Sequence, residues 1–149
     1  MNNLIQNLKK VFIFRLLNED ELSRLADMVK EAAHPKGSVI FSEQDEGDAM
    51  FVIKDGLVRI SVKREAEDVE LTTLMPGDFF GEIALFEKVP RTATAKAVDN
   101  TVLYVIHRDD FSGLISNSPY TAIKILFRII QDMGKRIRIS NISNYRRSA

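Results

Sequence analysis

The most informative stretch of the sequence runs from residue 79 to residue 94 and reads FFGEIALFEKVPRTAT. Gly81 precedes a short helix-compatible run, so backbone N–H groups at a helix start are expected to face outward there and favour an anion. Arg91 carries a planar guanidinium that can bond two oxygens of such an anion. Glu82 only accepts hydrogen bonds when ionised, so it suits a hydroxyl better than a phosphate. Together, these residue types describe a binding site for a sugar phosphate.

Each of these residues also has an ordinary structural explanation. Gly81 can serve only a turn, and Glu82 can cap a helix. An arginine that follows a proline, as Arg91 does, is usually a solvated surface residue. The spacing of the residues therefore does not decide the chemistry by itself.

Short strands separated by turns are predicted around this stretch, from Ser38 to His107. Asp55-Gly56 is the strongest hairpin signal in the sequence, because glycine accepts the positive φ that such turns need. So many short strands in about 70 residues favour a small barrel or sandwich over a parallel sheet. The predicted strands are Val39 to Ser42, Ala49 to Lys54, Leu57 to Lys63, Val69 to Leu74, Thr92 to Val98 and Thr101 to Ile106.

An N-terminal helical zone is predicted before these strands, from Met1 to Ala33. Asn18 is the expected N-cap of a helix, and the acidic residues 19–21 that follow it suit the positive end of the helix dipole. Leu22 and Leu25 recur at helical spacing, and the stretch 34–37, which reads HPKG, is expected to end the helix.

Two helices are predicted after the strands, a short one from Arg108 to Ile115 and a long one from Tyr120 to roughly Asn144. The break between them is the stretch 116–119, which reads SNSP. We therefore expect one domain over residues 1–149. It would consist of a helical lead-in (1–36), a β-barrel (37–107) and C-terminal helices (108–149).

The long helix carries an apolar pattern of about two and a half heptads, which resembles a coiled-coil seam. Such a helix could press one face on the strands and another on a second copy of the chain, so a homodimer is predicted. The alternative is a helix that lies only on its own domain, because seams this short are weak signals. The first core positions are Ile123, Ile130 and Ile137, the second are Leu126, Met133 and Ser140, and Ile125, Phe127 and Ile129 widen the apolar surface.

Composition narrows the class of protein. The 149 residues include 21 Lys plus Arg and 21 Asp plus Glu, so net charge gives no bulk attraction to nucleic acid or to an anionic membrane. There is no cysteine, which excludes a disulfide scaffold and a thiol nucleophile. The only histidines are His34 and His107, so no metal or other cofactor is expected. The apolar run Val11–Phe14 is too short for a signal peptide or a membrane span, and a cytoplasmic protein is expected.

The stretch 79–94 resembles the phosphate-binding cassette of the cyclic nucleotide-binding domain family, in the form Phe-Gly-Glu-Ile-Ala-Leu followed by Pro-Arg-Thr-Ala. That family includes the bacterial catabolite activator protein and the regulatory subunits of protein kinase A. The likeness extends over nearly the whole chain, because the helical lead-in, the glycines of the strand region, the cassette and the C-terminal helices follow the family order. It implies a mainly β fold with flanking α-helices. In that fold, a double-stranded β-helix (jelly-roll) barrel lies between N-terminal helices and a long C-terminal helix.

The resemblance also implies a role for the residues at each end of the cassette. Glu82 would accept the ribose 2′-hydroxyl, and Arg91 would pair with the cyclic phosphate. The backbone N–H groups of Ala84 and Ile83 would surround the phosphate, and Gly81 would allow its close approach. Some relatives have lost the arginine or the glutamate and no longer bind a nucleotide. This chain has both, which favours a working pocket.

Recognition of the base involves further residues. Thr92 would lend its hydroxyl to the phosphate or the base, and Ala93 would leave room beside the ligand. Family members with a long C-terminal helix cover the base with it, which makes Ser140 and Asn141 candidates; a solvated helix end is the alternative. Thr92 resembles the threonine that accompanies cGMP preference in some eukaryotic members, but in bacterial-looking sequences this threonine does not decide the preference. The expected ligand is cAMP, with cGMP as second choice.

The resemblance implies a cyclic nucleotide sensor that changes conformation on binding its ligand and has no catalytic activity. The alternative is a dimerising interaction module whose pocket is vestigial or holds another small anion. An enzyme of the cupin type would need a histidine-rich ligand set, which two separate histidines do not supply.

Direct DNA binding is not expected. Lys135, Arg136, Arg138 and Arg146-Arg147 form a basic cluster, but a few charges near a helix end are usually a solvated face. Family members that are transcription factors carry a helix-turn-helix domain after the long helix, where only residues 145–149 follow here. The sequence does not name a downstream partner.

Overall fold

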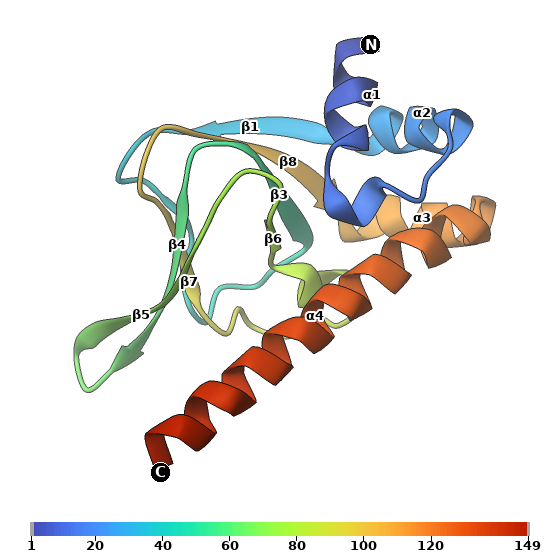
Figure 1. Ribbon diagram of the computed structural model, residues 1–149. Helices are drawn as coiled ribbons and strands as arrows, with labels where there is room; N and C mark the ends of the chain where they lie inside the picture. Colours follow the sequence, from blue (N-terminus) through green and yellow to red (C-terminus); the bar gives the residue numbers. More distant parts are fainter. Residues whose placement is uncertain (1, 149) are drawn as a thin grey trace.

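The fold consists of strands in the middle of the chain and helices at both ends (Figure 1). The computed structural model describes residues 2–148, and the surroundings of side chains for residues 3–142. Each strand that the sequence predicted is present, with ends that differ by up to two residues, and the helices before and after the strands are present too. The elements are α1 (Asn2–Lys9), η1 (Phe12–Phe14), α2 (Glu19–Met28), β1 (Lys30–His34), β2 (Val39–Phe41), β3 (Ala49–Asp55), β4 (Val58–Arg64), β5 (Glu67–Leu74), β6 (Phe79–Phe80), η2 (Glu82–Leu85), β7 (Thr94–Ala97), β8 (Thr101–His107), α3 (Arg108–Asn117) and α4 (Pro119–Ser148).

The strands form two four-stranded sheets with the orders β1-β8-β3-β6 and β2-β7-β4-β5. All the strand pairs in them are antiparallel. Ile53 and Leu103 of the first sheet pack with Val58 and Ala95 of the second, so the two sheets face each other. The mainly β jelly-roll fold with flanking helices is confirmed. Among the described residues, its strands form two facing sheets and not one closed barrel.

A second and larger core lies between the first sheet and the helices. Tyr104 and Ile106 of β8 pack there with Leu22 and Leu25 of α2 and with Ile125 of α4. All five side chains are essentially buried. The helices therefore cover the outer face of this sheet, and its two central strands, β3 and β8, are apolar on both faces.

The prediction that the N-terminal helical zone extends to Ala33 is wrong. Helix α2 ends at Met28, and residues 30–34 form strand β1, which pairs with β8 from Lys30 opposite Val105 to His34 opposite Thr101. The sequence of β1, Lys-Glu-Ala-Ala-His, has good intrinsic helix propensity. Pairing with an otherwise unpaired side of β8 overrides that propensity.

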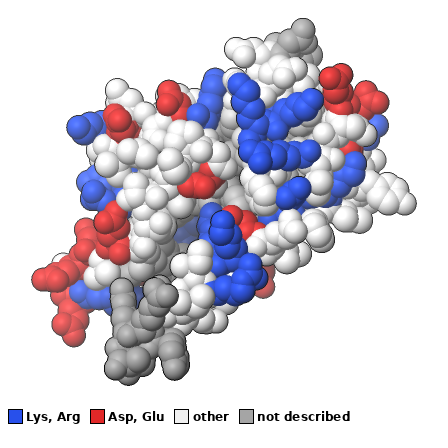
Figure 2. Space-filling model, in the orientation of Figure 1, with Lys and Arg blue, Asp and Glu red and all other residues white. Residues whose placement is uncertain are grey.

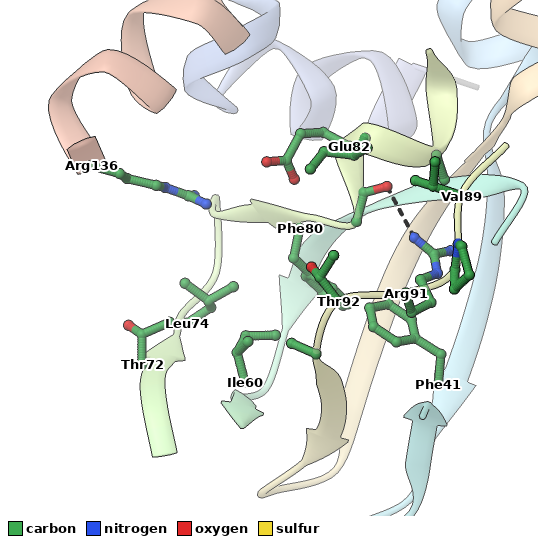
Figure 3. Close-up of a pocket in the computed structure, with 15 residues that line it drawn as sticks. Phe41, Ile60, Thr72, Leu74, Phe80, Glu82, Val89, Arg91, Thr92 and Arg136 are labelled. Atoms are coloured by element: carbon green, nitrogen blue, oxygen red, sulfur yellow. Dashed lines mark hydrogen bonds between the residues drawn. The ribbon is translucent and has the colours of Figure 1, made fainter. Parts of the chain in front are cut away.

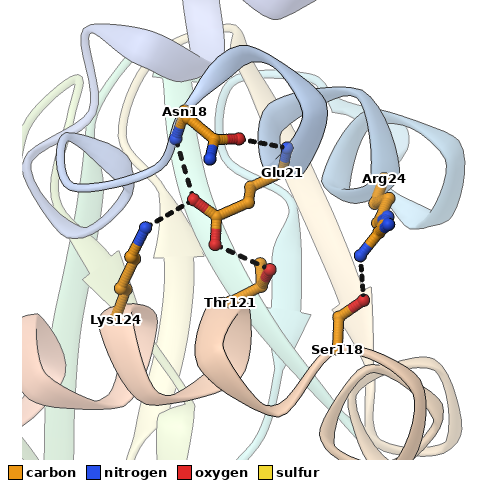
Figure 4. Close-up of polar contacts among 6 residues, drawn as sticks. All are labelled: Asn18, Glu21, Arg24, Ser118, Thr121 and Lys124. Atoms are coloured by element: carbon orange, nitrogen blue, oxygen red, sulfur yellow. Dashed lines mark hydrogen bonds and ion pairs between the residues drawn. The ribbon is translucent and has the colours of Figure 1, made fainter.

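The N-terminus of α2 is capped as the sequence predicted. The Asn18 side chain accepts a hydrogen bond from the Glu21 N–H, and the Glu21 carboxylate accepts one from the Asn18 N–H, both at 2.9 Å. The same carboxylate reaches α4, where it accepts hydrogen bonds from Thr121 at 2.9 Å and from Lys124 at 2.6 Å (Figure 4). The Arg24 guanidinium donates to the Ser118 hydroxyl beside it. These polar contacts fix α2 to the start of α4 and to Ser118, the residue just before it.

Helix α4 has two apolar faces. Ile125 and Ile129 are buried in the domain's own core, and Leu126 and Met133 pack partly against it. The predicted second row of the coiled-coil seam is therefore largely used within the domain. The predicted first row points away from it, since Ile123, Ile130 and Ile137 are 57%, 67% and 59% exposed, and the neighbouring Phe127 and Tyr120 are exposed too.

Positive and negative side chains are interspersed over the face seen in Figure 2, with acidic residues gathered over the β4–β5 hairpin. The basic cluster predicted near the C-terminus lies partly outside the described side chains, since those of Arg146 and Arg147 are not described. None of the described helices is both long enough and apolar enough to cross a membrane.

Candidate functional site

A pocket lies between the second sheet, the segment 79–93 and helix α4 (Figure 3). It contains seven of the nine residues predicted to bind a ligand, and the apolar side chains of β4, β5 and the Val89 turn form much of its wall. The lining residues are Phe41, Ile60, Thr72, Leu74, Phe80, Gly81, Glu82, Ile83, Ala84, Val89, Pro90, Arg91, Thr92, Ala93 and Arg136.

The local fold of the cassette follows from its sequence. Phe79 and Phe80 are buried and pair as β6 with β3. Gly81 then takes a left-handed conformation, with φ of 73°, which a residue with a side chain rarely adopts. The chain turns there into η2, the short helix that starts at Glu82, as the sequence predicted. The turn leaves the start of η2 at the pocket.

Arg91 is buried and held by carbonyl groups. Its Nη1 donates to the Gly81 carbonyl at 3.1 Å and its Nη2 to the Ala49 carbonyl at 2.8 Å. The residue is only 8% exposed, and its Nε has no hydrogen-bond partner among the described residues. A buried N–H without an acceptor is costly, so the site can gain from a ligand oxygen. The surface arginine of the alternative interpretation is excluded.

Two glycines make room for this guanidinium. A Cβ on Gly47 would lie 2.3 Å from the Arg91 Nε and 2.5 Å from its Cζ. A Cβ on Gly81 would lie 2.7 Å from its Nη1. Real Cβ atoms essentially never come so close to another atom. Gly81 is therefore more than a turn residue, and Gly47 has a role that the sequence analysis did not assign.

The guanidinium also lies over aromatic rings. Its Cζ is 4.2 Å from the centre of the Phe41 ring and 5.7 Å from that of Phe51. Burial lowers the pKa of Arg91; the carboxylate of Asp48 opposes this effect and the positive charge of Arg108 adds to it. An arginine stays protonated in spite of such a shift. The pocket therefore contains a permanent and poorly solvated positive charge, which an anion would neutralise.

The other predicted cassette residues also lie at the pocket. In Figure 3, the Glu82 carboxylate points to the side of the pocket from which the Arg136 side chain extends, and Thr92 lies below Glu82 and to the left of Arg91. Ile83 is 41% exposed, and Ala84 is buried. The Ala84 N–H donates to the Gly81 carbonyl at 3.3 Å and so closes the first turn of η2.

Arg136 of α4 is a pocket residue that sequence reasoning missed. Its Nη2 donates to the Phe79 carbonyl at 3.2 Å, and its Cζ lies 4.7 Å from the centre of the Phe79 ring. Its Nε pairs with Asp132, one helical turn earlier, at 2.6 Å. In the sequence, Arg136 stands among several basic residues, and no local pattern distinguishes it. Its position depends on how α4 crosses the sheets.

Ser140 and Asn141 do not line the pocket. Both are exposed on α4, beyond Arg136, which is the residue of that helix at the pocket. Four residues of helix advance about 6 Å along the axis, so Ser140 lies one turn farther along. That either side chain contacts a base remains a prediction.

The pocket is thus polar at two ends and apolar between them. The buried cation and the start of η2 can hold an anion, while the Glu82 carboxylate can accept a hydrogen bond from a hydroxyl. Ile60, Leu74 and Val89 offer an apolar wall to a flat ring. No group of His, Cys, Asp or Glu that could hold a metal ion occurs in the described part of the chain.

Similarity to known proteins supports this interpretation. Residues 32–118 match the family described as the cyclic nucleotide-binding domain. The chain is 34% identical over 145 residues to the cGMP-dependent protein kinase egl-4 of Caenorhabditis elegans, covering 95% of this chain and 17% of the kinase. It therefore spans about a sixth of the length of that relative.

Solved structures resemble the chain as well. A cyclic nucleotide-binding domain from Methylobacillus flagellatus superimposes with a TM-score of 0.82 at 24% identity, over 93% of this chain and 79% of that one, and supports the fold. The regulatory domain of Toxoplasma gondii protein kinase A, solved with cAMP, has a TM-score of 0.67 and 28% identity, over 75% of this chain and 43% of that one. From the matched sequence, the fold and the cassette together, we conclude that the chain belongs to the cyclic nucleotide-binding domain family.

Proposed function

We propose that the chain is a sensor for a cyclic nucleotide, with cAMP as the first ligand to test and cGMP as the second. The observation that carries the proposal is the buried guanidinium of Arg91, which has an unpartnered Nε and lies at one end of a pocket that also contains a carboxylate. A cyclic phosphodiester carries one negative charge and several acceptor oxygens, and its sugar carries a hydroxyl donor. These groups complement the two ends of the pocket.

In this proposal each pocket residue has a separate task. Arg91 and the N–H groups at the start of η2 bind the phosphate, and the Glu82 carboxylate accepts the ribose 2′-hydroxyl. The Thr92 hydroxyl is within the same pocket and can bond the phosphate or the base. The base lies toward α4, where Arg136 is available to stack on it or to donate a hydrogen bond.

The test is isothermal titration of the wild-type chain with cAMP and with cGMP, followed by the Arg91→Ala and Glu82→Ala variants. Removing one partner of a buried charge pair costs about 2–5 kcal/mol, so Arg91→Ala should weaken binding from about 30-fold to several thousand-fold. Glu82→Ala should weaken it less, because the lost partner is a neutral hydroxyl. Unchanged affinity in Arg91→Ala would refute the assignment.

A thermal-shift measurement separates the sensor from an interaction module with a vestigial pocket. A ligand that binds only the folded chain raises its melting temperature by mass action. If cAMP, cGMP and cyclic dinucleotides all leave the melting temperature unchanged, the pocket is vestigial and the module is the better description. If another small anion alone raises it, the pocket has a different ligand.

A conformational response is part of the proposal. Arg136 joins α4 to the Phe79 carbonyl at the edge of the cassette. A ligand that moves either group therefore shifts the equilibrium between two positions of α4. The chain would act through that shift, in the cytoplasm and without catalysis of its own. Its downstream partner would bind or respond according to the position of α4.

Homodimerisation through α4 is the other part of the proposal. The row Ile123, Phe127, Ile130 and Ile137 is apolar, exposed and on the face opposite the buried Ile125. Exposed apolar residues that follow one helix face are typical of an interface between helices. A second copy would present the same row, so the contact would be self-complementary.

A further inference from the structure

Two arginines hold the same two segments of the chain. One segment is residues 47–49, which lead into β3 and include its first residue, and the other is the part of the cassette from Gly81 to Glu87. Arg91 bonds the Ala49 and Gly81 carbonyls, as described above. The second arginine is Arg108, the first residue of α3, which lies outside the pocket lining.

Arg108 makes several bonds to these segments. Its Nε donates to the Ala84 carbonyl and its Nη2 to the Gly47 carbonyl, both at 2.6 Å. The Nη2 also lies 3.4 Å from the Glu87 carbonyl, and the Arg108 backbone N–H donates to the Asp48 carbonyl at 2.7 Å. Three consecutive carbonyls, those of residues 47, 48 and 49, are thereby bonded to the two arginines.

The contacts to η2 orient that helix. The Ala84 and Glu87 carbonyls belong to the last turn of η2 and the residues just after it, where carbonyl groups lack intrahelical partners. Because the carbonyls of a helix point toward its C-terminal end and the N–H groups toward its start, a side chain that fixes the carbonyls at Arg108 directs the N–H groups to the pocket.

The contact to Gly47 fixes the wall behind Arg91. The α-carbon of Gly47 lies against the Arg91 guanidinium, since a Cβ there would overlap its Nε and Cζ. The carbonyl of the same residue is bonded to Arg108. A shift of Arg108 therefore moves both the wall against which Arg91 packs and the helix that bears the N–H groups.

We propose that Arg108 is a positioning residue of the phosphate site: it holds the Gly47 turn and η2 at the separation at which Arg91 and the N–H groups of η2 meet one phosphate. The inference rests on the proposed function, because it assigns a role in binding a cyclic nucleotide. Arg108 itself does not touch the ligand. It also ties this geometry to α3, whose first residue it is.

The experiment uses the two phosphorothioate diastereomers of cAMP, in which sulfur replaces one or the other exocyclic phosphate oxygen. Each oxygen has its own partners in the site, so the ratio of the two affinities reports the orientation of the phosphate relative to Arg91 and η2. Titrations compare the wild-type chain, Arg108→Gln and Arg108→Lys. The control is Arg64→Gln, the same change at an exposed residue of the β4–β5 hairpin. Among the residues whose side chains the structure describes, its guanidinium bonds only the neighbouring Lys63 carbonyl.

We expect Arg108→Gln to weaken cAMP binding by about tenfold. The ratio of the affinities for the two diastereomers should also come at least about threefold nearer to one. Arg64→Gln should leave both quantities unchanged. If Arg108 had a merely structural role, its substitution would lower the folded fraction and weaken the binding of both diastereomers equally. A wild-type ratio in Arg108→Gln would therefore overturn the inference while leaving the sensor function intact.

Arg108→Lys covers the case in which the glutamine variant does not fold. Lysine retains the charge but lacks the planar fork that bonds the Ala84 and Gly47 carbonyls together, so the ratio should still move toward one. A wild-type ratio in this variant overturns the inference as well. If the wild-type chain binds neither cAMP nor cGMP, the proposed function fails and the inference fails with it.

Discussion

The substitution Gly47→Ala adds one methyl group beside the Arg91 guanidinium and replaces none of the side chains that are proposed to contact the ligand. The new Cβ would lie 2.3 Å from the Arg91 Nε, whereas ordinary contacts begin near 3.4 Å. The guanidinium or the turn must therefore move by about 1 Å. The φ of Gly47 is not in the left-handed region, so the alanine adds no backbone strain of that kind.

A movement of that size breaks the hydrogen bonds of Arg91. Its bonds to the Ala49 and Gly81 carbonyls, now 2.8 and 3.1 Å long, would stretch beyond the hydrogen-bonding range. Hydrogen bonds to a charged group contribute about 1.5–3 kcal/mol each, and partial relaxation leaves an expected destabilisation of about 1–3 kcal/mol. The phosphate would also meet a displaced cation, which should weaken nucleotide affinity by about 30-fold or more.

The assay combines urea unfolding of the ligand-free chain with isothermal titration by cAMP and cGMP. The matched control is Gly113→Ala in α3, where an added Cβ meets nothing within 4 Å. Alanine in a helix interior is favoured over glycine by about 0.5–1 kcal/mol, so this variant should be slightly more stable and bind normally. If folded Gly47→Ala binds within about twofold of the wild-type chain, Arg91 does not depend on the Gly47 wall and the reasoning is wrong.

Two further predictions concern the helices. Glu21 lies in a partly desolvated site, which by itself would raise its pKa, but the hydrogen bonds from Asn18, Lys124 and Thr121 outweigh that effect and lower the pKa below its ordinary value of 4.5. A carboxylate with a lowered pKa adds stability above its unfolded pKa and loses it as the pH falls through the folded pKa. In urea unfolding, Glu21→Gln should therefore be less stable than the wild-type chain at pH 7, and the difference should shrink as the pH falls below 4.5 and through the lowered folded-state pKa; a difference independent of pH would contradict this. For α4, Ile130→Glu should convert a dimer to a monomer in light scattering, because it places a charge in the exposed apolar row. Val39→Glu, at a 52% exposed residue of β2, should leave the dimer intact, and equal masses for the two variants would count against the interface.

The sequence predicted most of the strands because their signals are local. Alternation of apolar residues, the Asp55-Gly56 turn and the Asn18 cap each depend on a few neighbouring residues, and each is present in the structure. Strand β1 was not predicted, because its residues favour a helix and only its pairing with β8 makes it a strand. The two residues of β6 are too few to show a pattern and were assigned to the cassette alone.

The residues of the candidate site likewise differ in whether a local sequence signal could predict them. Glu82, Arg91 and the residues next to them stand within one short segment, so a motif could identify them. Gly47 and Arg136 come from distant segments, 44 residues before and 45 residues after Arg91. Neither has a local signal, since one is a turn glycine and the other a charge on a helix. Only the fold brings them to the guanidinium and to the pocket.

The hydrogen bonds that hold Arg91 between the Ala49 and Gly81 carbonyls affect the expected rate of ligand binding. A free arginine samples many rotamers and loses about 2 kcal/mol of conformational entropy when it is immobilised. Here that loss occurs during folding, before any nucleotide arrives. An incoming phosphodiester meets a cation that is already stationary, so its capture should be limited by diffusion into the cavity and not by a search among side-chain conformations.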